Sequence, residues 1–342
     1  MKKLAAIIFI LLLMTFGFLG CSNFTKLAIQ RQAKKAVDYS YMQDDKMHIF
    51  LCGTGSPVPD PNHLEPCVAI VVSGQILLVD TGNGAIDRVR SLKLPLNLIT
   101  KVFITHFHSD HIGGLGEVIN TSWIFGRAQA IDIYGPQGIH KVVKGFNLAY
   151  SFDADYRAKH HGNDMKLKDR KVNISSFNFE NSNEAVTIYK GDDLIVSTFL
   201  VDHAPAQPAV GYRFEYKGKI LVISGDTVMN KTVERYSKDA DMLIHSAMHK
   251  GLNRMVAETL QEIDGKPMQR AGRMLEDTLN YQTDTTELGK LAQRSGVRRL
   301  VLTHLVPPPR YFFMRRAFKK SVSEFYKGEL ILGEDYMHLE ID

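Results

Sequence analysis

The sequence predicts an α+β fold of four layers (αββα), in which two β-sheets pack face to face and helices cover both outer surfaces. The first observation is a series of short apolar or alternating segments bounded by turn residues, which is typical of strands. The second is that amphipathic helical segments interrupt this series, so sheets and helices must pack as layers. The third is that no linker, internal repeat or low-complexity tract divides the chain after residue 46, which indicates a single domain.

Each element is expected from its own local pattern. The strands are expected at residues 48–52, 67–73, 75–79, 101–105, 131–134, 172–179, 194–201, 209–216, 219–223, 242–245 and 299–303. Helices are expected at 85–93, 137–150, 285–294 and 312–326, where apolar residues recur with helical spacing. The turn signal Ser73-Gly74 predicts a hairpin between the second and third strands. The polar segment 153–170 is interpreted as an insertion, either a lid or an ordinary surface loop.

The N-terminus has the pattern of an export signal. Met1-Lys2-Lys3 precedes an apolar run over residues 4–19, which is short for a membrane span. The run ends in Gly20-Cys21-Ser22, which resembles a bacterial lipobox, so we expect a lipoprotein signal peptide over 1–20 and an acylated Cys21. An uncleaved signal anchor is the alternative. We therefore expect an exported protein on the periplasmic side, anchored to the membrane (Ser22 favours the outer one), with a polar stalk at 21–46 and the domain at 47–342.

Composition and charge argue against a polyanion-binding protein. Hydrophobic residues make up 44% and charged residues 23% of the 342, as in an ordinary globular chain. Removing Lys2 and Lys3 from the formal charge of +5 leaves +3, which is mild and dispersed. The helical spacing of the basic residues from 310 to 320 favours a solvated helix face over a nucleic-acid surface. With Cys21 assigned to lipid, Cys52 and Cys67 are either a disulfide or two buried thiols.

A dense cluster of metal-binding side chains follows the apolar strand at 101–105. His106, His108, Asp110 and His111 place three imidazoles and one carboxylate within six positions of a loop. A solvated loop has no reason to collect three histidines, whereas a divalent metal needs imidazole and carboxylate donors from a short, well-held segment. The glycines at 113, 114 and 116 then permit a close backbone approach and the start of a helix.

This cluster, together with five other motifs, resembles the metallo-β-lactamase superfamily. The motifs, in chain order, are Gly53-Thr54-Gly55-Ser56-Pro57, Leu78-Val79-Asp80-Thr81-Gly82, Val201-Asp202-His203-Ala204-Pro205, Ser224-Gly225-Asp226-Thr227 and Leu302-Thr303-His304. The resemblance covers about residues 47 to 340 and implies the superfamily's αββα sandwich. It also implies that one metal is held by His106, His108 and His203, and a second by Asp110, His111 and His304, with Asp226 bridging the two.

The bridging Asp226 indicates the phosphodiesterase, arylsulfatase and thioester-hydrolase branches rather than the β-lactamases. Segments 53–57, 208–214, 224–227 and 301–308 resemble the arylsulfatase group related to ribonuclease Z. This chain departs from that group at Gln282, where the group has a His, and at Gln207, where it has a Lys. Since Gln cannot act as a general acid, we expect an aryl leaving group, whose pKa of about 10 makes protonation less necessary.

The expected activity is therefore hydrolysis of a small aryl sulfate or phosphodiester by a hydroxide held between two divalent ions. Zn²⁺ fits the donors best, with Fe or Mn as alternatives. Asp110 and Asp226 are the expected catalytic carboxylates, and no nucleic-acid partner is expected. Asp80 is expected to orient a ligand or cap a turn, and His245, His249 and Gln282 to contact substrate or lie buried behind the ligands. The alternatives are a ribonuclease Z-like phosphodiesterase, a thioester or lactone hydrolase, and a non-catalytic metal-binding lipoprotein.

Overall fold

Two seven-stranded β-sheets form the centre of the computed structural model, which describes residues 24–181, 184–191 and 193–342. The strand order is β14-β1-β2-β3-β4-β5-β6 in the first sheet and β13-β12-β11-β10-β9-β8-β7 in the second. The strands are β1 (Met47–Gly53), β2 (Cys67–Val72), β3 (Gln75–Val79), β4 (Ile99–Phe103), β5 (Ile131–Pro136), β6 (Val172–Phe177), β7 (Val186–Gly191), β8 (Leu194–Val201), β9 (Ala209–Tyr216), β10 (Lys219–Ile223), β11 (Met242–Met248), β12 (Arg299–Val306), β13 (Glu329–Leu332) and β14 (Met337–Ile341).

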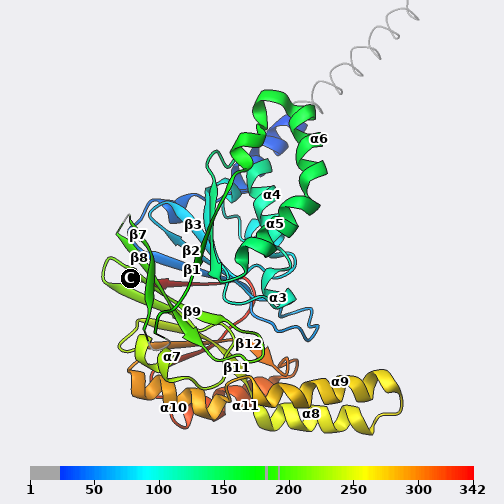
Figure 1. Cartoon of the computed structure of the whole chain (residues 1–342), viewed down its shortest axis with the longest axis vertical. Helices are drawn as coiled ribbons and strands as arrows, with labels where there is room; N and C mark the ends of the chain where they lie inside the picture. Colours follow the sequence, from blue (N-terminus) through cyan, green and yellow to red (C-terminus); the bar gives the residue numbers. More distant parts are fainter. Residues whose placement is uncertain (1–23, 182–183, 192) are drawn as a thin grey trace, which may run out of the picture.

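Helices cover the outer face of each sheet (Figure 1). They are α2 (Ala85–Ser91), α3 (Ser109–Ile112), α4 (Leu115–Ile124), α5 (Ile139–Ala149), α6 (Ser151–His161), α7 (Lys231–Tyr236), α8 (Lys250–Glu262), α9 (Lys266–Asp277), α10 (Thr285–Ser295) and α11 (Phe312–Ser323). Short 3₁₀ turns lie at Ser40–Met42, Leu96–Leu98, Gly162–Asp164, Leu167–Arg170 and Thr278–Asn280. Helices α2, α4 and α5 share an apolar core with the first sheet, and α7, α10 and α11 share one with the second.

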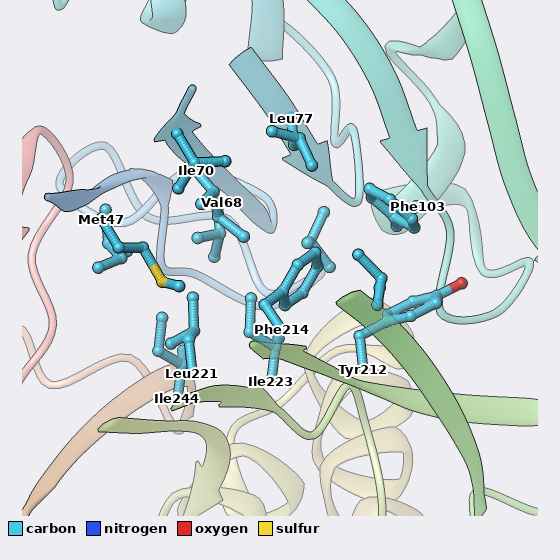
Figure 2. Close-up of a cluster of buried hydrophobic side chains, with 14 of the residues drawn as sticks. Met47, Val68, Ile70, Leu77, Phe103, Tyr212, Phe214, Leu221, Ile223 and Ile244 are labelled. Carbon is cyan, nitrogen blue, oxygen red and sulfur yellow. The ribbon is translucent and has the colours of Figure 1, made fainter. Parts of the chain in front are cut away.

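The largest apolar core lies between the two sheets. In β1, Met47, Ile49 and Leu51 face this central core, while Phe50 and Cys52 face the helices on the other side. Such strands read as continuous apolar runs because both of their faces are buried. Figure 2 shows side chains from the two sheets meeting in the central core, among them Val68, Leu77, Phe103, Tyr212, Phe214 and Leu221. The predicted α+β class and the αββα layering are confirmed.

The predicted hairpin between β2 and β3 is confirmed. Val72 pairs with Gln75, and the two residues of the turn, Ser73 and Gly74, have φ of 48° and 68°. Positive φ at both positions is the geometry that matches the twist of the flanking strands, and glycine adopts it without strain. The disulfide between Cys52 and Cys67 joins β1 to β2 and closes the loop between them.

Some elements differ from the sequence-based expectations. Most of segment 153–170 is not a loop, since α6 runs to His161 and a second short 3₁₀ turn follows at Leu167–Arg170. The strands β7, β13 and β14 are additional; all three are short and lie at sheet edges. Helices α8 and α9, which were not predicted, form a hairpin that projects from the body (Figure 1), and each buries only two residues.

The N-terminal predictions fall mainly outside the described residues. The signal peptide over 1–20 and the acylation of Cys21 cannot be placed and stay predictions. Residues 24–35 form an exposed helix, and within the described ranges no helix is long and apolar enough to cross a membrane. The second half of the predicted stalk packs on the domain, because the Asp38 amide donates to the Lys93 carbonyl and the Tyr41 ring contacts Phe50.

Candidate metal centre

The ends of five strands bring the predicted ligands to one edge of the sandwich. Asp80 follows β3 and the loop from His106 to His111 follows β4, whereas His203 follows β8 and Asp226 follows β10 in the other sheet. His304 lies inside β12 rather than after it. Asp80 and His304 have φ of 56° and 47°, a left-handed conformation that non-glycine residues rarely adopt and that is often kept at functional sites.

Two hydrogen bonds across the sandwich hold the loop after β4 in place. The Val210 amide donates to the Thr105 carbonyl at 3.0 Å, and the Tyr212 hydroxyl donates to the Ile104 carbonyl at 2.6 Å. Both donors lie on β9 of the second sheet. The histidine loop of the first sheet is thereby fixed against β9, which pairs with β8 and β10, the strands that precede His203 and Asp226.

Three imidazole nitrogens converge in the first group of side chains. His106 Nε2 lies 2.9 Å from His108 Nδ1, and His203 Nε2 lies 3.3 Å from the same atom. His106 and His203 are buried, while His108 is exposed. Three nitrogen donors with one side open to solvent match the ligand set of a catalytic metal that keeps a free position.

The second group combines carboxylates with imidazoles. His304 Nε2 lies 3.4 Å from Asp110 Oδ2, and His111 Nε2 lies 3.5 Å from it. Asp226 Oδ2 stands between the two groups, at 3.0 Å from His304 Nε2, 3.6 Å from His111 Nε2 and 3.8 Å from His203 Nε2. The structure therefore brings all seven predicted ligands together, with Asp226 where a bridging ligand would stand.

Asp80 and Thr105 set the tautomers of two of these histidines. Asp80 Oδ1 accepts the Thr105 amide at 2.8 Å, and Oδ2 accepts the Thr105 hydroxyl at 2.8 Å and His111 Nδ1 at 2.7 Å. Because the single hydroxyl proton of Thr105 goes to Asp80, its oxygen accepts from His106 Nδ1 at 3.1 Å. His106 and His111 thus carry their protons on Nδ1 and present the Nε2 lone pair to the site, which is the second-sphere arrangement of metal-binding histidines.

The tautomer of His203 is fixed in the same way by a backbone group. His203 Nδ1 lies 3.0 Å from the Tyr281 carbonyl, which can only accept. The proton therefore lies on Nδ1, and Nε2 faces His108 and Asp226 with its lone pair.

The charges at the site fit a pair of cations. Burial lowers the pKa of His106 well below its ordinary value and also lowers the pKa of His203, so both rings are neutral donors. Burial opposes protonation of His111 as well, but Asp80, Asp110 and Asp226 outweigh it and raise its pKa well above the ordinary value. His111 Nε2 nevertheless has no hydrogen-bond partner among the described residues. Without metal these carboxylates therefore favour a second proton on His111, and a divalent ion held at Nε2 would take the place of that proton.

A pocket opens above the two groups of ligands. Its wall combines the metal-facing residues His108, Asp110, His203, Asp226 and His304 with Ser56, Pro57, Val58, Ser109, Thr278, Tyr281, Gln282 and Val306. Gln282 is buried, and its Nε2 donates to Asp226 Oδ2 at 2.8 Å, while its Oε1 has no partner among the described residues. Gln282, where the resembled group has a His, therefore touches Asp226 and borders the space above it.

His245 and His249 lie away from this pocket. His245 is fully buried on β11; its Nδ1 donates to the Ser246 carbonyl at 2.6 Å, and burial lowers its pKa to about 4. His249 caps α8, where its Nδ1 accepts from the Leu252 amide at 3.3 Å, and its ring contacts Phe318. In the structure these two side chains have structural partners, and neither borders the pocket.

Three residues of the site have no signal of their own in the sequence. Thr105 and Tyr281 fix ligand tautomers through one hydroxyl and one carbonyl. Asp335 fixes the loop at the rim, since its carboxylate accepts the Thr54 amide, the Thr54 hydroxyl and the Leu64 amide at 2.9, 2.7 and 2.8 Å. Thr105 could have been singled out by its place before the first histidine, but the other two act over contacts that only the fold creates.

Comparison with known proteins finds one matching family model and several curated relatives. The family model described as anti-Pycsar protein Apyc1 matches residues 47–304. The ribonuclease Z of Mycolicibacterium gilvum (strain PYR-GCK) is 32% identical over 264 residues, which cover 76% of this chain and 85% of that protein. The ribonuclease Z of Mycobacterium marinum (strain ATCC BAA-535 / M) is 31% identical over 298 residues, covering 86% and 99%.

Solved structures support the fold. The metallo-β-lactamase fold protein YhfI from Bacillus subtilis matches with a TM-score of 0.60 and 17% identity, over 87% of this chain and 100% of that one. Human tRNase Z, short form (ELAC1), matches with a TM-score of 0.57 and 22% identity, over 86% and 99%. At these identities the likeness concerns the fold.

The relatives correct the expected partners. A small-molecule ester substrate and the absence of a nucleic-acid partner were inferred from Gln282 and from the location, yet the matching curated relatives are ribonucleases. The inference from Gln282 is wrong because paired metal ions can themselves stabilise the leaving oxygen of a phosphodiester. A side-chain acid at position 282 is therefore not required for RNA chemistry.

The geometry and the comparisons agree on the class of protein. The αββα sandwich, the ligand-type side chains at its edge and the matched family model cover the same part of the chain, from β1 to β12. The chain belongs to the family of the anti-Pycsar protein Apyc1 and is a hydrolase of the metallo-β-lactamase superfamily, in its ribonuclease Z-like branch.

Proposed function

We propose that this protein is a two-metal phosphodiesterase that cleaves a phosphodiester bond in RNA. The observation that carries the proposal is the position of Asp226 Oδ2, which lies within 3.0 to 3.8 Å of nitrogens from His304, His111 and His203. A carboxylate shared between two groups of donors suits two ions held a few ångströms apart. Such a pair suits in-line displacement at phosphorus.

The ligand-type side chains form two groups, and each group would hold one metal ion. His106, His108 and His203 would hold one ion, and Asp110, His111 and His304 the other, with Asp226 between them. When bound, two divalent ions, with Zn²⁺ the best fit to imidazole and carboxylate donors, supply a nucleophile at neutral pH and neutralise charge on the phosphoryl oxygens. Asp80 and Thr105 keep the nitrogens of His106 and His111 aimed at these positions.

The chain's own residues then orient the substrate and accept a proton. Asp110, on the pocket wall, is placed to take the proton that the attacking water loses. Gln282 holds Asp226 in place, because its Nε2 donates to Asp226 Oδ2 at 2.8 Å. Pro57, Val58 and the Tyr281 ring give the pocket an apolar side against which a base can pack.

Cleavage of RNA is better supported than hydrolysis of an aryl sulfate. The expectation of an aryl leaving group depended on Gln282 lacking an acidic proton, whereas the curated relatives are ribonucleases at 31 to 32% identity. A sulfatase would also leave the similarity to these relatives without an explanation. No contact among the pocket residues supports a thioester or a lactone as the substrate of this centre.

The test is a substrate panel on the full chain loaded with Zn²⁺. We expect cleavage of an end-labelled RNA at a discrete position, with p-nitrophenyl sulfate hydrolysed at a rate near background. Asp226→Ala should abolish RNA cleavage because it removes the shared ligand, whereas Asp155→Ala, an exposed aspartate on α6, should retain it. Turnover of the sulfate with intact RNA, or equal RNA cleavage by Asp226→Ala, would refute the proposal.

A further inference from the structure

A second group of metal-type side chains lies on the outer face of the first sheet. It consists of His48 on β1 and of His338 and Glu340 on β14. Since Met47 and Ile49 face the core between the sheets, His48 faces the opposite side. In the antiparallel register His48 pairs with Glu340, and His338 is one pleat away on the same face. The first and last strands of the fold thus present three donors to one point.

The donor atoms of this group are close enough to share one ion. His48 Nδ1 lies 3.0 Å from His338 Nε2 and 3.9 Å from Glu340 Oε2. The ligand-type atoms of the three side chains lie within 4.8 Å of one another. His48 is 2% exposed, whereas His338 is exposed, so the point they face is open to solvent on one side.

Asp44 fixes His48 as a donor toward this point. His48 Nε2 lies 2.9 and 3.0 Å from the two carboxylate oxygens of Asp44, which can only accept from it when ionised. The proton of His48 is therefore on Nε2, and its Nδ1 accepts a hydrogen bond from His338 Nε2, whose proton a metal ion bound at this point would replace. A histidine that donates one nitrogen to a carboxylate and presents the other is the usual form of a metal-binding imidazole.

The neighbouring rings hold both imidazoles in place. Phe50 stacks on His338 with centroids 4.4 Å apart, and Tyr41 contacts His48 and His338 edge-on at 5.1 and 5.0 Å. Because both rings are fixed before an ion arrives, little side-chain entropy is lost on binding.

The remaining charges leave one carboxylate oxygen available. Lys46 Nζ donates to Glu340 Oε1 at 3.1 Å and to Asp342 Oδ1 at 2.6 Å. Glu340 Oε2 is the oxygen that faces His48, so the lysine does not occupy the position of the ion. Two nitrogens and one oxygen, with a water to complete four ligands, suit Zn²⁺ and its neighbours rather than Mg²⁺ or Ca²⁺.

We propose that His48, His338 and Glu340 bind one divalent transition-metal ion of the zinc class, separate from the centre at Asp226. The ion fastens β14 to β1 and, through Asp44, to the segment that precedes β1. Its role is structural, because it joins the two ends of the folded domain at an edge strand that pairs on one side only. Zn²⁺ bound there stabilises the native state by mass action.

The experiment compares metal content between variants of the full chain. After loading with Zn²⁺ and removal of free metal, the wild type is expected to retain one ion more per chain than His338→Ala or Glu340→Gln. His140→Ala removes an exposed histidine of α5 and serves as the matched control, with the wild-type content. Zn²⁺ should also raise the Tm of the wild type by more than that of either variant, by a few degrees when Zn²⁺ is in large excess over its Kd.

The difference in bound Zn²⁺ between the wild type and each variant distinguishes failure of this site from failure of the centre at Asp226. If the latter held no metal, all totals would fall but the difference of one ion would persist. Equal metal content and equal Zn²⁺-dependent Tm shifts in wild type, His338→Ala and Glu340→Gln would overturn the proposal. Glu340→Gln keeps the size of the side chain and leaves the ring of His338 on Phe50, so it decides the outcome if His338→Ala does not fold.

Discussion

Replacement of Asp80 by Asn tests how the metal centre is held. The carboxylate accepts three hydrogen bonds, one at Oδ1 from the Thr105 amide and two at Oδ2 from the Thr105 hydroxyl and His111 Nδ1. An amide keeps only one oxygen. If its nitrogen replaces Oδ2, that nitrogen donates to His111 Nδ1 and forces the proton onto Nε2, where it blocks metal binding. If the nitrogen replaces Oδ1, two donors face each other, the side-chain amide introduced at position 80 and the Thr105 backbone amide, and the hydrogen bond between them is lost.

The magnitude follows from these contacts. Each lost hydrogen bond to a charged acceptor is worth about 1.5–3 kcal/mol, so the metal-free form should lose about 3 kcal/mol of its free energy of unfolding. The wrong tautomer of His111 should weaken metal binding about 10- to 100-fold, as changes to residues behind metal ligands usually do. Chain fold and pocket shape should persist because the two side chains have nearly the same size.

The assay is a competition between the protein and a chelator for Zn²⁺, read at neutral pH. Asp132→Asn is the matched control, because Asp132 accepts one exposed hydrogen bond from Asn173 and should leave affinity unchanged. An affinity for Zn²⁺ within about twofold of the wild type in Asp80→Asn, where about 10-fold or more is expected, would refute the assignment of Asp80 as the residue that sets the tautomers.

Four further outcomes are expected. Gln282→His should raise kcat/KM for RNA by about 10- to 100-fold relative to an aryl phosphodiester, because it adds a general acid beside Asp226; an equal change for both substrates contradicts this. Asp335→Ala should lower the free energy of unfolding by about 2 kcal/mol in urea, since three donors of the rim loop lose their acceptor, and an unchanged value would exclude that role. The buried neutral ring of His245 has a pKa of about 4 in the folded protein and about 6.5 in the unfolded chain. The unfolded chain therefore gains a proton first as the pH falls, and the free energy of unfolding, unaffected by this group above pH 6.5, drops by about 3 kcal/mol between pH 6.5 and pH 4. His245→Asn should flatten that part of a stability–pH profile, and an identical slope would speak against it. Cys21→Ala should leave the protein in the soluble fraction without an added lipid mass, whereas an unchanged mass in the membrane fraction would exclude acylation at Cys21.

Much of the fold can be predicted from local patterns. The sequence predicts β8, β9 and β10 with the bounds that the structure shows, because each is a mostly apolar or alternating run that ends at turn residues such as Lys217-Gly218. The helices α8 and α9 were missed although their apolar residues recur with helical spacing; in the structure they pack mainly on each other and bury few residues. Edge strand β14 does alternate, with Met337, Leu339 and Ile341 toward the central core and His338 and Glu340 on its outer face, but it was not predicted; it is only five residues long.

The site is more predictable than the substrate. The dense loop cluster identifies His106, His108, Asp110 and His111 as ligand-type side chains. The resemblance to the metallo-β-lactamase superfamily adds His203, Asp226 and His304, and the structure brings all seven together. Asp335 and the carbonyl of Tyr281 act through long-range contacts that have no sequence pattern. The substrate expectation is wrong because a single residue, Gln282, was taken to decide leaving-group chemistry that two metal ions can also perform.

The most direct test of the two-metal centre is a crystal structure of the Zn²⁺-loaded chain with anomalous diffraction data at the zinc edge. We expect two peaks about 3.5–4 Å apart at the pocket floor, one within reach of His106, His108 and His203 and the other of Asp110, His111 and His304, with Asp226 contacting both. The absence of zinc at these side chains, or a single peak that Asp226 does not touch, would contradict the two-metal mechanism.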